Sequence, residues 1–109
     1  MEFSTLEARI RNTEENIKKC EEQLMRYEQR VQLGSLELEA AGVDLSNLLS
    51  ARQKALNKDD FDLVWRINHH MELLRNIEKC YQKLPILRQK LRQYTERLPE
   101  QTDGEGARA

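Results

Sequence analysis

The stretch that decides the fold of this protein reads DDFDLVWRINHHMELLRNIEKCYQKLPILRQKLRQYTERL and covers residues 59–98. Its apolar residues recur at spacings of three and four, which is the pattern of a long amphipathic helix. The first part has a wide apolar face, and such a width indicates contact with two neighbouring elements. The second part narrows to one stripe typical of a coiled-coil seam. We predict a helix over residues 60–98, with a kink near Pro85 where a backbone hydrogen bond is lost.

A second seam lies upstream and predicts a helix over residues 5–32. Its apolar positions alternate spacings of four and three, while the positions between them are almost all polar. So narrow a stripe suits a two-stranded coiled coil. We predict that the two seams, with the aromatic anchors of the wide face, form protein interfaces through Leu6, Ile10, Ile17, Leu24, Tyr27, Val31, Phe61, Trp65, Ile77, Leu84, Leu87, Leu91, Tyr94 and Leu98.

Glycine and aspartate mark the predicted breaks between helices. Gly34 can adopt the left-handed conformation that ends a helix. We predict a second helix over residues 36–57, weakened at Gly42; the alternative is a shorter helix capped by Asp44. Asp59 is a favourable N-cap for the third helix.

The fold class that follows is all-α, with three long helices in a hairpin or bundle that has extended coiled-coil segments. Charged residues make up 34% of the chain and aromatic residues only 6%, a composition that fits long helices better than β-sandwiches or barrels. Residues 1–98 are expected to form a single domain. Residues 99–109 begin with Pro99, continue no apolar stripe and are predicted to be a disordered acidic tail.

No combination of residues points to chemistry. His69 and His70 are adjacent on the helix and diverge by about 100°, and Cys80 lies about 16 Å further along the axis than His69, so no metal site is expected. Cys20 and Cys80 fall on equivalent seam positions and are expected to be buried free thiols, with a disulfide as the alternative. Since phosphate-binding loops and hydrolase motifs are also absent, we expect no enzyme activity, catalytic residue or cofactor.

Compartment follows from cysteine content and hydropathy. Two cysteines without a secretory signal fit a reducing cytoplasmic compartment, and a nuclear location fits as well. No apolar run approaches the roughly 20 residues that a membrane helix needs.

His70 lies on the extension of the seam, where it and Arg66 are expected to act as polar specificity positions.

The stretch LLSARQKALNKDDFDLVWRINHHMELLRNIE, residues 48–78, resembles two families of helical hairpin. One comprises the FlgN/FliT-like export chaperones of flagellar and type III secretion, and this resemblance implies binding of an amphipathic client helix. The residues that carry it are Leu48-Leu49, Ala55-Leu56, Asp59/Asp60 and Leu73-Leu74.

The other is the UVR motif of excision-repair and related proteins, which implies a protein-contact hairpin. Asp60-Phe61, Val64 and Ile67 match it, whereas its Arg-Asp pair is absent because Arg66 is followed by Ile67. In addition, LLRNIEKCYQKLPILRQKL, residues 73–91, is similar to the final helix of coiled-coil subunits in lysosome-positioning and lysosome-biogenesis complexes. Pro85 departs from that pattern.

The sequence therefore predicts a non-enzymatic protein–protein interaction module: a small coiled-coil adaptor or assembly subunit of a hetero-oligomer, with other helical proteins as partners. A homodimer is the alternative assembly. The alternative function is a dedicated chaperone with a client groove lined by the second and third helices. A nucleic-acid-associated hairpin is the least favoured class, because the net charge is only −1. Its candidate contacts are Arg75, Lys79, Lys83, Arg88, Lys90 and Arg92.

Overall fold

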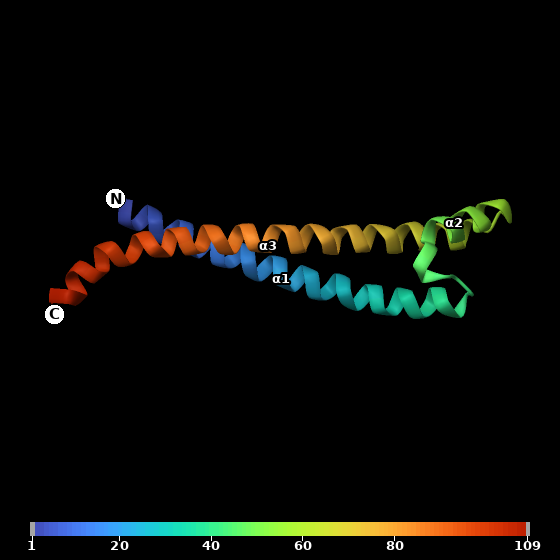
Figure 1. Ribbon diagram of the computed structural model, residues 1–109, viewed down its shortest axis with the longest axis horizontal. Coiled ribbons are helices and arrows are strands. Elements are labelled where there is room, and N and C mark those ends of the chain that lie inside the picture. The colour runs from blue at the N-terminus through green and yellow to red at the C-terminus, as the bar shows by residue number, and fades with distance from the viewer. Residues whose placement is uncertain (1, 109) are drawn as a thin grey trace. The chain divides into compact units, whose positions relative to one another are not determined.

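The protein is all-α, as the sequence predicts. The computed structural model describes the backbone of residues 2–108 and the side chains of residues 5–98. The elements, in chain order, are α1 (Glu2–Ala40), the short 3-10 helix η1 (Leu45–Asn47), α2 (Leu48–Asn57) and α3 (Phe61–Arg108) (Figure 1). The described residues form no β-strand.

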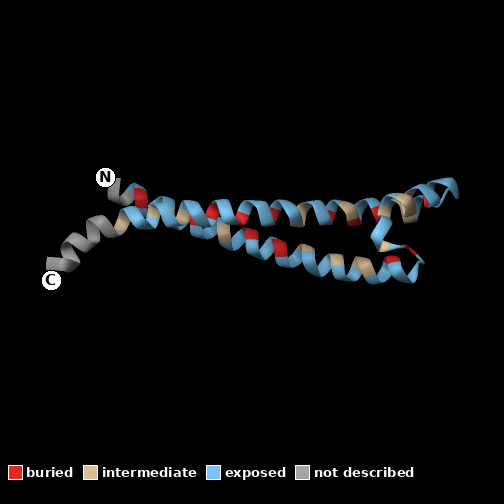
Figure 2. Ribbon diagram, viewed as in Figure 1, coloured by how far each residue is buried: buried red, intermediate tan, exposed pale blue. Residues whose placement is uncertain are grey.

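The chain forms two compact units, and its organisation as a single domain stays a prediction. One unit contains the chain up to Glu22 and from Cys80 onward, and the other contains Gln23–Lys79. In each unit a segment of α1 lies antiparallel beside a segment of α3 (Figure 1). Buried residues recur along both helices at helical spacing (Figure 2).

The predicted stripe of α1 is the face that becomes buried. Every position of the stripe is buried or half-buried, and nearly all positions between are exposed; the stripe consists of Leu6, Ile10, Thr13, Ile17, Cys20, Leu24, Tyr27 and Val31. Thr13 is tolerated there because its hydroxyl donates to the carbonyl of Arg9 within the same helix. The chain therefore covers much of its seams by itself, and their role in binding a partner stays a prediction.

The first helix ends at a different glycine from the one predicted. The prediction that it ends near residue 32 is wrong, because α1 continues through Gly34 to Ala40. Gly42 instead has a positive φ of 82°, and the amide of Val43 donates to the carbonyl of Leu38 at 2.9 Å. This is the Schellman arrangement, and Val43 and Leu38 supply the apolar contact that accompanies it.

The predicted continuous helix over residues 36–57 is also wrong, and the alternative with Asp44 as a cap is the better description. The Asp44 carboxylate accepts hydrogen bonds from the amide and the hydroxyl of Ser46, at 2.9 and 2.6 Å. These bonds hold the pKa of Asp44 below its ordinary value. Asn47 then caps α2 by accepting from the amide of Ser50.

The turn between α2 and α3 shifts the predicted cap by one residue. Asp59 has a φ of 56°, so it adopts the left-handed conformation instead of capping α3. Asp60 is the cap, and its carboxylate accepts from the amide of Leu63 at 3.2 Å. Asp62 lies in the first turn of α3, where the helix dipole favours a negative charge.

Neither proline ends α3. The helix continues through Pro85, where a kink stays a prediction, and the buried Leu84 and Leu87 lie on the two sides of the proline in the seam. It also continues past Leu98 to Arg108, so the backbone of residues 99–108 is helical where a disordered tail is predicted. The loss of one hydrogen bond is compatible with continuation where the neighbouring residues keep theirs.

The main core of the Gln23–Lys79 unit lies where α1, η1, α2 and α3 meet. Leu38, Val43 and Ile67 form its buried centre. Partly buried side chains from η1, α2 and α3 pack around it: Leu45, Leu48, Ala51, Leu63 and Met71. The wide apolar face at the start of α3 therefore contacts two neighbours, α1 and α2, as its width predicts.

Candidate functional site

The two aromatic anchors predicted from the sequence lie outside the buried seam. Phe61 and Trp65 are each 65% exposed, one helical turn apart at the start of α3. The other predicted interface residues are buried or half-buried inside the two units. Large exposed aromatic side chains are a common feature of binding surfaces, which makes this part of α3 the best candidate site.

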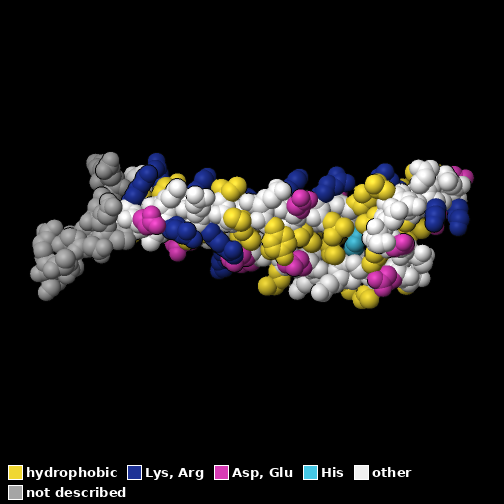
Figure 3. Space-filling model, in the orientation of Figure 1, with side chains coloured by type: hydrophobic (Ala, Val, Ile, Leu, Met, Phe, Trp, Pro, Cys, Tyr) yellow, Lys and Arg dark blue, Asp and Glu magenta, His cyan; other side chains and the backbone are white. Residues whose placement is uncertain are grey.

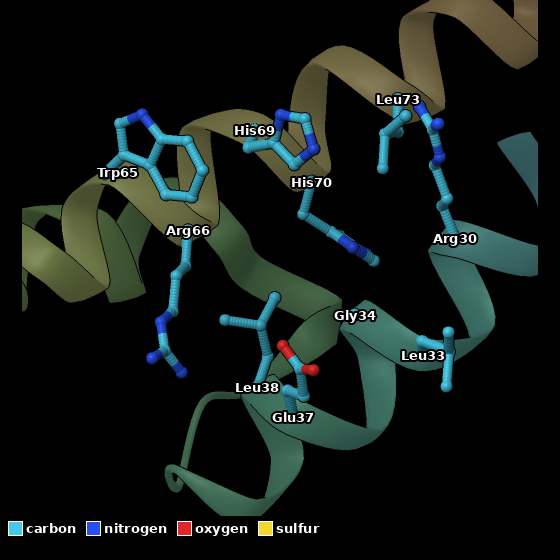
Figure 4. Close-up of a pocket in the computed structure, with 10 residues that line it drawn as sticks. All are labelled: Arg30, Leu33, Gly34, Glu37, Leu38, Trp65, Arg66, His69, His70 and Leu73. Carbon is cyan, nitrogen blue, oxygen red and sulfur yellow. The ribbon is translucent and has the colours of Figure 1, made fainter.

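Trp65 is fixed in place by its own helix. Its ring stacks on that of His69, with 5.3 Å between centroids and an interplanar angle of 2° (Figure 4). Arg66, beside it, forms an ion pair with Asp62 at 3.1 Å and is exposed, so its predicted role as a seam position is wrong. Ile67 takes the buried position instead, because the buried positions Ile67, His70 and Leu73 follow one another at intervals of three.

A pocket of about 210 Å³ opens between α1 and α3 beside Trp65 (Figure 4). Its lining combines apolar side chains with charged groups at the edge: Arg30, Leu33, Gly34, Glu37, Leu38, Trp65, Arg66, His69, His70 and Leu73. A pocket of this kind can accept one apolar side chain and place a charged neighbour against its rim.

His70 and Gly34 form a close contact beside this pocket. A Cβ atom at Gly34 would lie 3.0 Å from Nδ1 of His70, so the imidazole occupies the space that a side chain there would need. His70 is only 5% exposed, and its Nδ1 has no hydrogen-bond partner among the described residues. Burial, followed by the nearby charge of His69, lowers the pKa of His70 below its ordinary value of 6.5.

The lowered pKa of His70 makes stability depend on pH. The unfolded chain binds the proton more readily, so the free energy of unfolding should be highest above the ordinary pKa of 6.5 and should fall as the pH drops below it. Denaturant titrations at several pH values between about 4.5 and 8 would measure this slope. His70→Gln should flatten the curve in this range, whereas His69→Gln should retain most of it. Equal slopes for the wild type and His70→Gln would contradict the assignment.

Cys20 and Cys80 face each other across the other unit. Both thiols are free and buried, and Sγ of Cys20 lies 3.8 Å from the carbonyl oxygen of Cys80. Burial, and then the proximity of Cys20, raise the pKa of the Cys80 thiol. A thiol that resists ionisation is a poor nucleophile, so Cys80 is ill suited to nucleophilic chemistry, and both buried thiols pack in the seam.

Both thiols should therefore be protected in the folded protein. We expect a thiol–disulfide exchange reagent to react about 100-fold more slowly in native buffer than in denaturant, because the reagent reaches the thiols only after local opening. Non-reducing denaturant should release two titratable thiols per chain. Rapid reaction in native buffer would contradict the burial, and the absence of titratable thiols would reveal the disulfide alternative.

The other predicted sites find less support. A cavity of about 470 Å³ lies between the connection after α1 and α2, takes only Leu63 from α3, and has polar lining residues such as Asp44, Ser50, Lys54 and Asp60. Arg88, one of the basic residues considered for nucleic-acid contact, pairs with Glu21 at 3.4 Å.

Among the described side chains, no three His, Cys, Asp or Glu residues gather as metal ligands. No helix within the described part of the chain has the length and apolar character required to cross a bilayer.

Sequence reasoning missed the apolar residues outside the stripes. Leu33 and Leu36 on α1 are 63% and 66% exposed. Hydrophobic side chains accordingly reach the surface between charged ones on the face shown in Figure 3. The sequence did hold a signal for these exposed residues: they are large apolar residues at positions outside the heptad stripes.

Comparison of the chain with protein-family models, with curated proteins and with solved structures found no match, so these comparisons lend no support to the three resemblances.

Proposed function

We propose that this protein is a non-enzymatic interaction module, acting as a small helical adaptor or assembly subunit of a hetero-oligomeric complex in the cytoplasm. The observation that supports this most directly is the exposure of Phe61 and Trp65 on a unit whose core is already filled by other residues. An exposed aromatic pair of this size contributes nothing to the core of its own unit. Burial against a partner helix would remove it from water.

The neighbouring α2 enlarges the proposed binding surface. Leu49 and Leu56 are exposed and lie seven residues apart, hence on one face of α2. Leu56 lies near the end of α2 and Phe61 begins α3, so these two residues lie on either side of the short turn that connects the helices. An amphipathic helix of a partner is the ligand that suits exposed apolar residues presented at helical spacing.

The test is a pull-down with the tagged chain from its source cell, followed by quantitative mass spectrometry. Phe61→Asp is a suitable variant, because an acidic residue in the first turn of α3 is compatible with the helix dipole. Ile86→Asp, at another exposed apolar position of α3, is the matched control. We expect the wild type and the control to recover helical partners at fixed stoichiometry and Phe61→Asp to lose them. Recovery of the bait alone by all three proteins would contradict the proposal.

A dedicated chaperone is the second candidate. Its client would enter the open apolar pocket beside Trp65, because the cavity beside α2 has a more polar lining. A chaperone should recover one substoichiometric client that disappears once the client is exported or assembled. The same pull-down therefore separates the two functions by stoichiometry.

A further inference from the structure

Within the Gln23–Lys79 unit, the face of α1 around Leu33 is exposed to solvent. Leu33 and Leu36 lie outside the stripe that faces α3, and both are more than half exposed. Their neighbours on the same face, Gln29, Arg30, Glu37 and Ala40, are exposed as well. This face therefore has an apolar centre with charged residues on either side, which is the layout of a protein interface.

The charges on this face have a definite order. Arg30 and Glu37 are seven residues apart, so they lie two turns from each other on the same side of α1 as Leu33. Within the described side chains, neither forms an ion pair. In Figure 4 they lie on opposite sides of Gly34 along α1. The point midway between these two opposite charges lies between Leu33 and Gly34, so the charges form a self-complementary pattern about that point.

A two-fold axis between Leu33 and Gly34 satisfies this pattern. It would make the α1 helices of two copies antiparallel and would bring Arg30 of each copy level with Glu37 of the other, so that two ion pairs form. A parallel arrangement would instead place like charges level with each other. The charge order therefore selects an antiparallel, symmetric contact.

The pocket beside Trp65 supplies the matching hole. In the antiparallel arrangement, Leu33 of one copy stands level with Gly34 of the other, where the space of a side chain is already taken by the His70 imidazole of the same copy. Gly34 belongs to the lining of the pocket, together with Trp65, His69 and Leu73. An exposed leucine thus meets an apolar pocket of about 210 Å³ whose rim carries the charges that pair with those of the incoming helix.

We propose that this protein forms a homodimer through this face, with the α1 helices antiparallel and Leu33 of each copy inserted into the pocket beside Trp65 of the other. The occupant is a second copy of this chain, because its α1, running in the opposite direction, places Glu37 level with Arg30 and Arg30 level with Glu37 of the first copy. The dimer goes beyond the proposed function and does not depend on it. It uses the face of α1 and the pocket beside Trp65, so of the exposed aromatic pair it leaves only Phe61, which does not line the pocket, for other partners.

The first test is the oligomeric state of the purified full-length chain. We expect sedimentation equilibrium to give the mass of a dimer for the wild type and the mass of a monomer for Leu33→Glu, with an unchanged helical circular dichroism spectrum. A wild type that stays monomeric up to about 100 μM, where weak interfaces still associate, would overturn the proposal.

The second test uses the symmetry of the charge pairs. Arg30→Glu alone and Glu37→Arg alone each replace two attractive contacts by two repulsive ones, so each should weaken the homodimer by about tenfold or more. Mixing the two variants should restore the wild-type affinity, because the mixed dimer again has an opposite charge in both pairs. The double variant Arg30→Glu/Glu37→Arg should dimerise by itself for the same reason.

Glu39→Arg is the matched control, because Glu39 is exposed on the same helix but points about 120° away from Leu33. It should leave the dimer unchanged. A dimer that persists in Leu33→Glu, or single charge variants that do not recover on mixing, would place the self-association elsewhere and overturn the proposed geometry.

Discussion

Truncation of Ile67 to alanine should lower the free energy of unfolding by about 2–5 kcal/mol. Ile67 is fully buried in one core with Leu38 and Val43, where α1, η1, α2 and α3 meet, so the removed atoms leave a cavity that few neighbours can fill. Chemical denaturation followed by far-ultraviolet circular dichroism would measure the loss. The expected result is a lower transition midpoint with an unchanged spectrum in the absence of denaturant.

Leu49→Ala is the matched control for this variant. It removes a side chain of similar size from a mostly exposed position of α2, so it should change the free energy of unfolding by less than about 1 kcal/mol. Losses of equal size in the two variants would show that Ile67 does not hold the junction of the helices together.

Leu24→Glu should destabilise the protein by roughly 3 kcal/mol, because it places an unpaired carboxylate in the buried seam of α1. Leu24 is 9% exposed, whereas its neighbour Met25 lies outside the seam and is 62% exposed. Met25→Glu therefore adds the same charge one residue away and should change the stability little. Denaturant titration of the two variants at neutral pH makes the comparison direct.

Similar stabilities for Leu24→Glu and Met25→Glu would contradict the seam assignment for α1. Repeating the titration at about pH 4 separates charge from shape. Protonation of the carboxylate introduced by Leu24→Glu would relieve only the cost of the charge, so part of the difference should remain at low pH.

The helices were predictable because heptad stripes are visible without knowledge of the partner surface. The stripe from Leu6 to Val31 appears in the structure as predicted, and so does the double contact at the start of α3. Periodicity reports which face of a helix is buried, and this signal lies in the sequence of that helix alone.

The end of α1 was misplaced because two glycines compete for the same role. A glycine ends a helix most effectively when an apolar residue follows it and packs on the residue at C3. Gly42 meets this condition through Val43 and Leu38. Gly34 does not, because Ser35 follows it. Weighing the residues around each glycine would have selected Gly42.

The candidate site was only partly predictable. Phe61 and Trp65 were identified from their residue type, but the pocket beside Trp65 depends on how α1 and α3 pack. That packing rests on the spacing of Ile67, His70 and Leu73, which departs from the alternation of three and four assumed for the seam. A local change of spacing is not visible until the opposing helix is in place.

The contact between Gly34 and His70 also fixes the alignment of the two helices. Two helices with regular heptads can slide past each other by seven residues and still match apolar residues with apolar residues. Such a slip would bring either Tyr27 or Ala41 to the place of Gly34: the ring of Tyr27 would collide with the buried imidazole of His70, and the Cβ of Ala41 would lie only 3.0 Å from its Nδ1. A hole on one helix and a single large side chain on the other thus act as a register lock, which selects one alignment by shape.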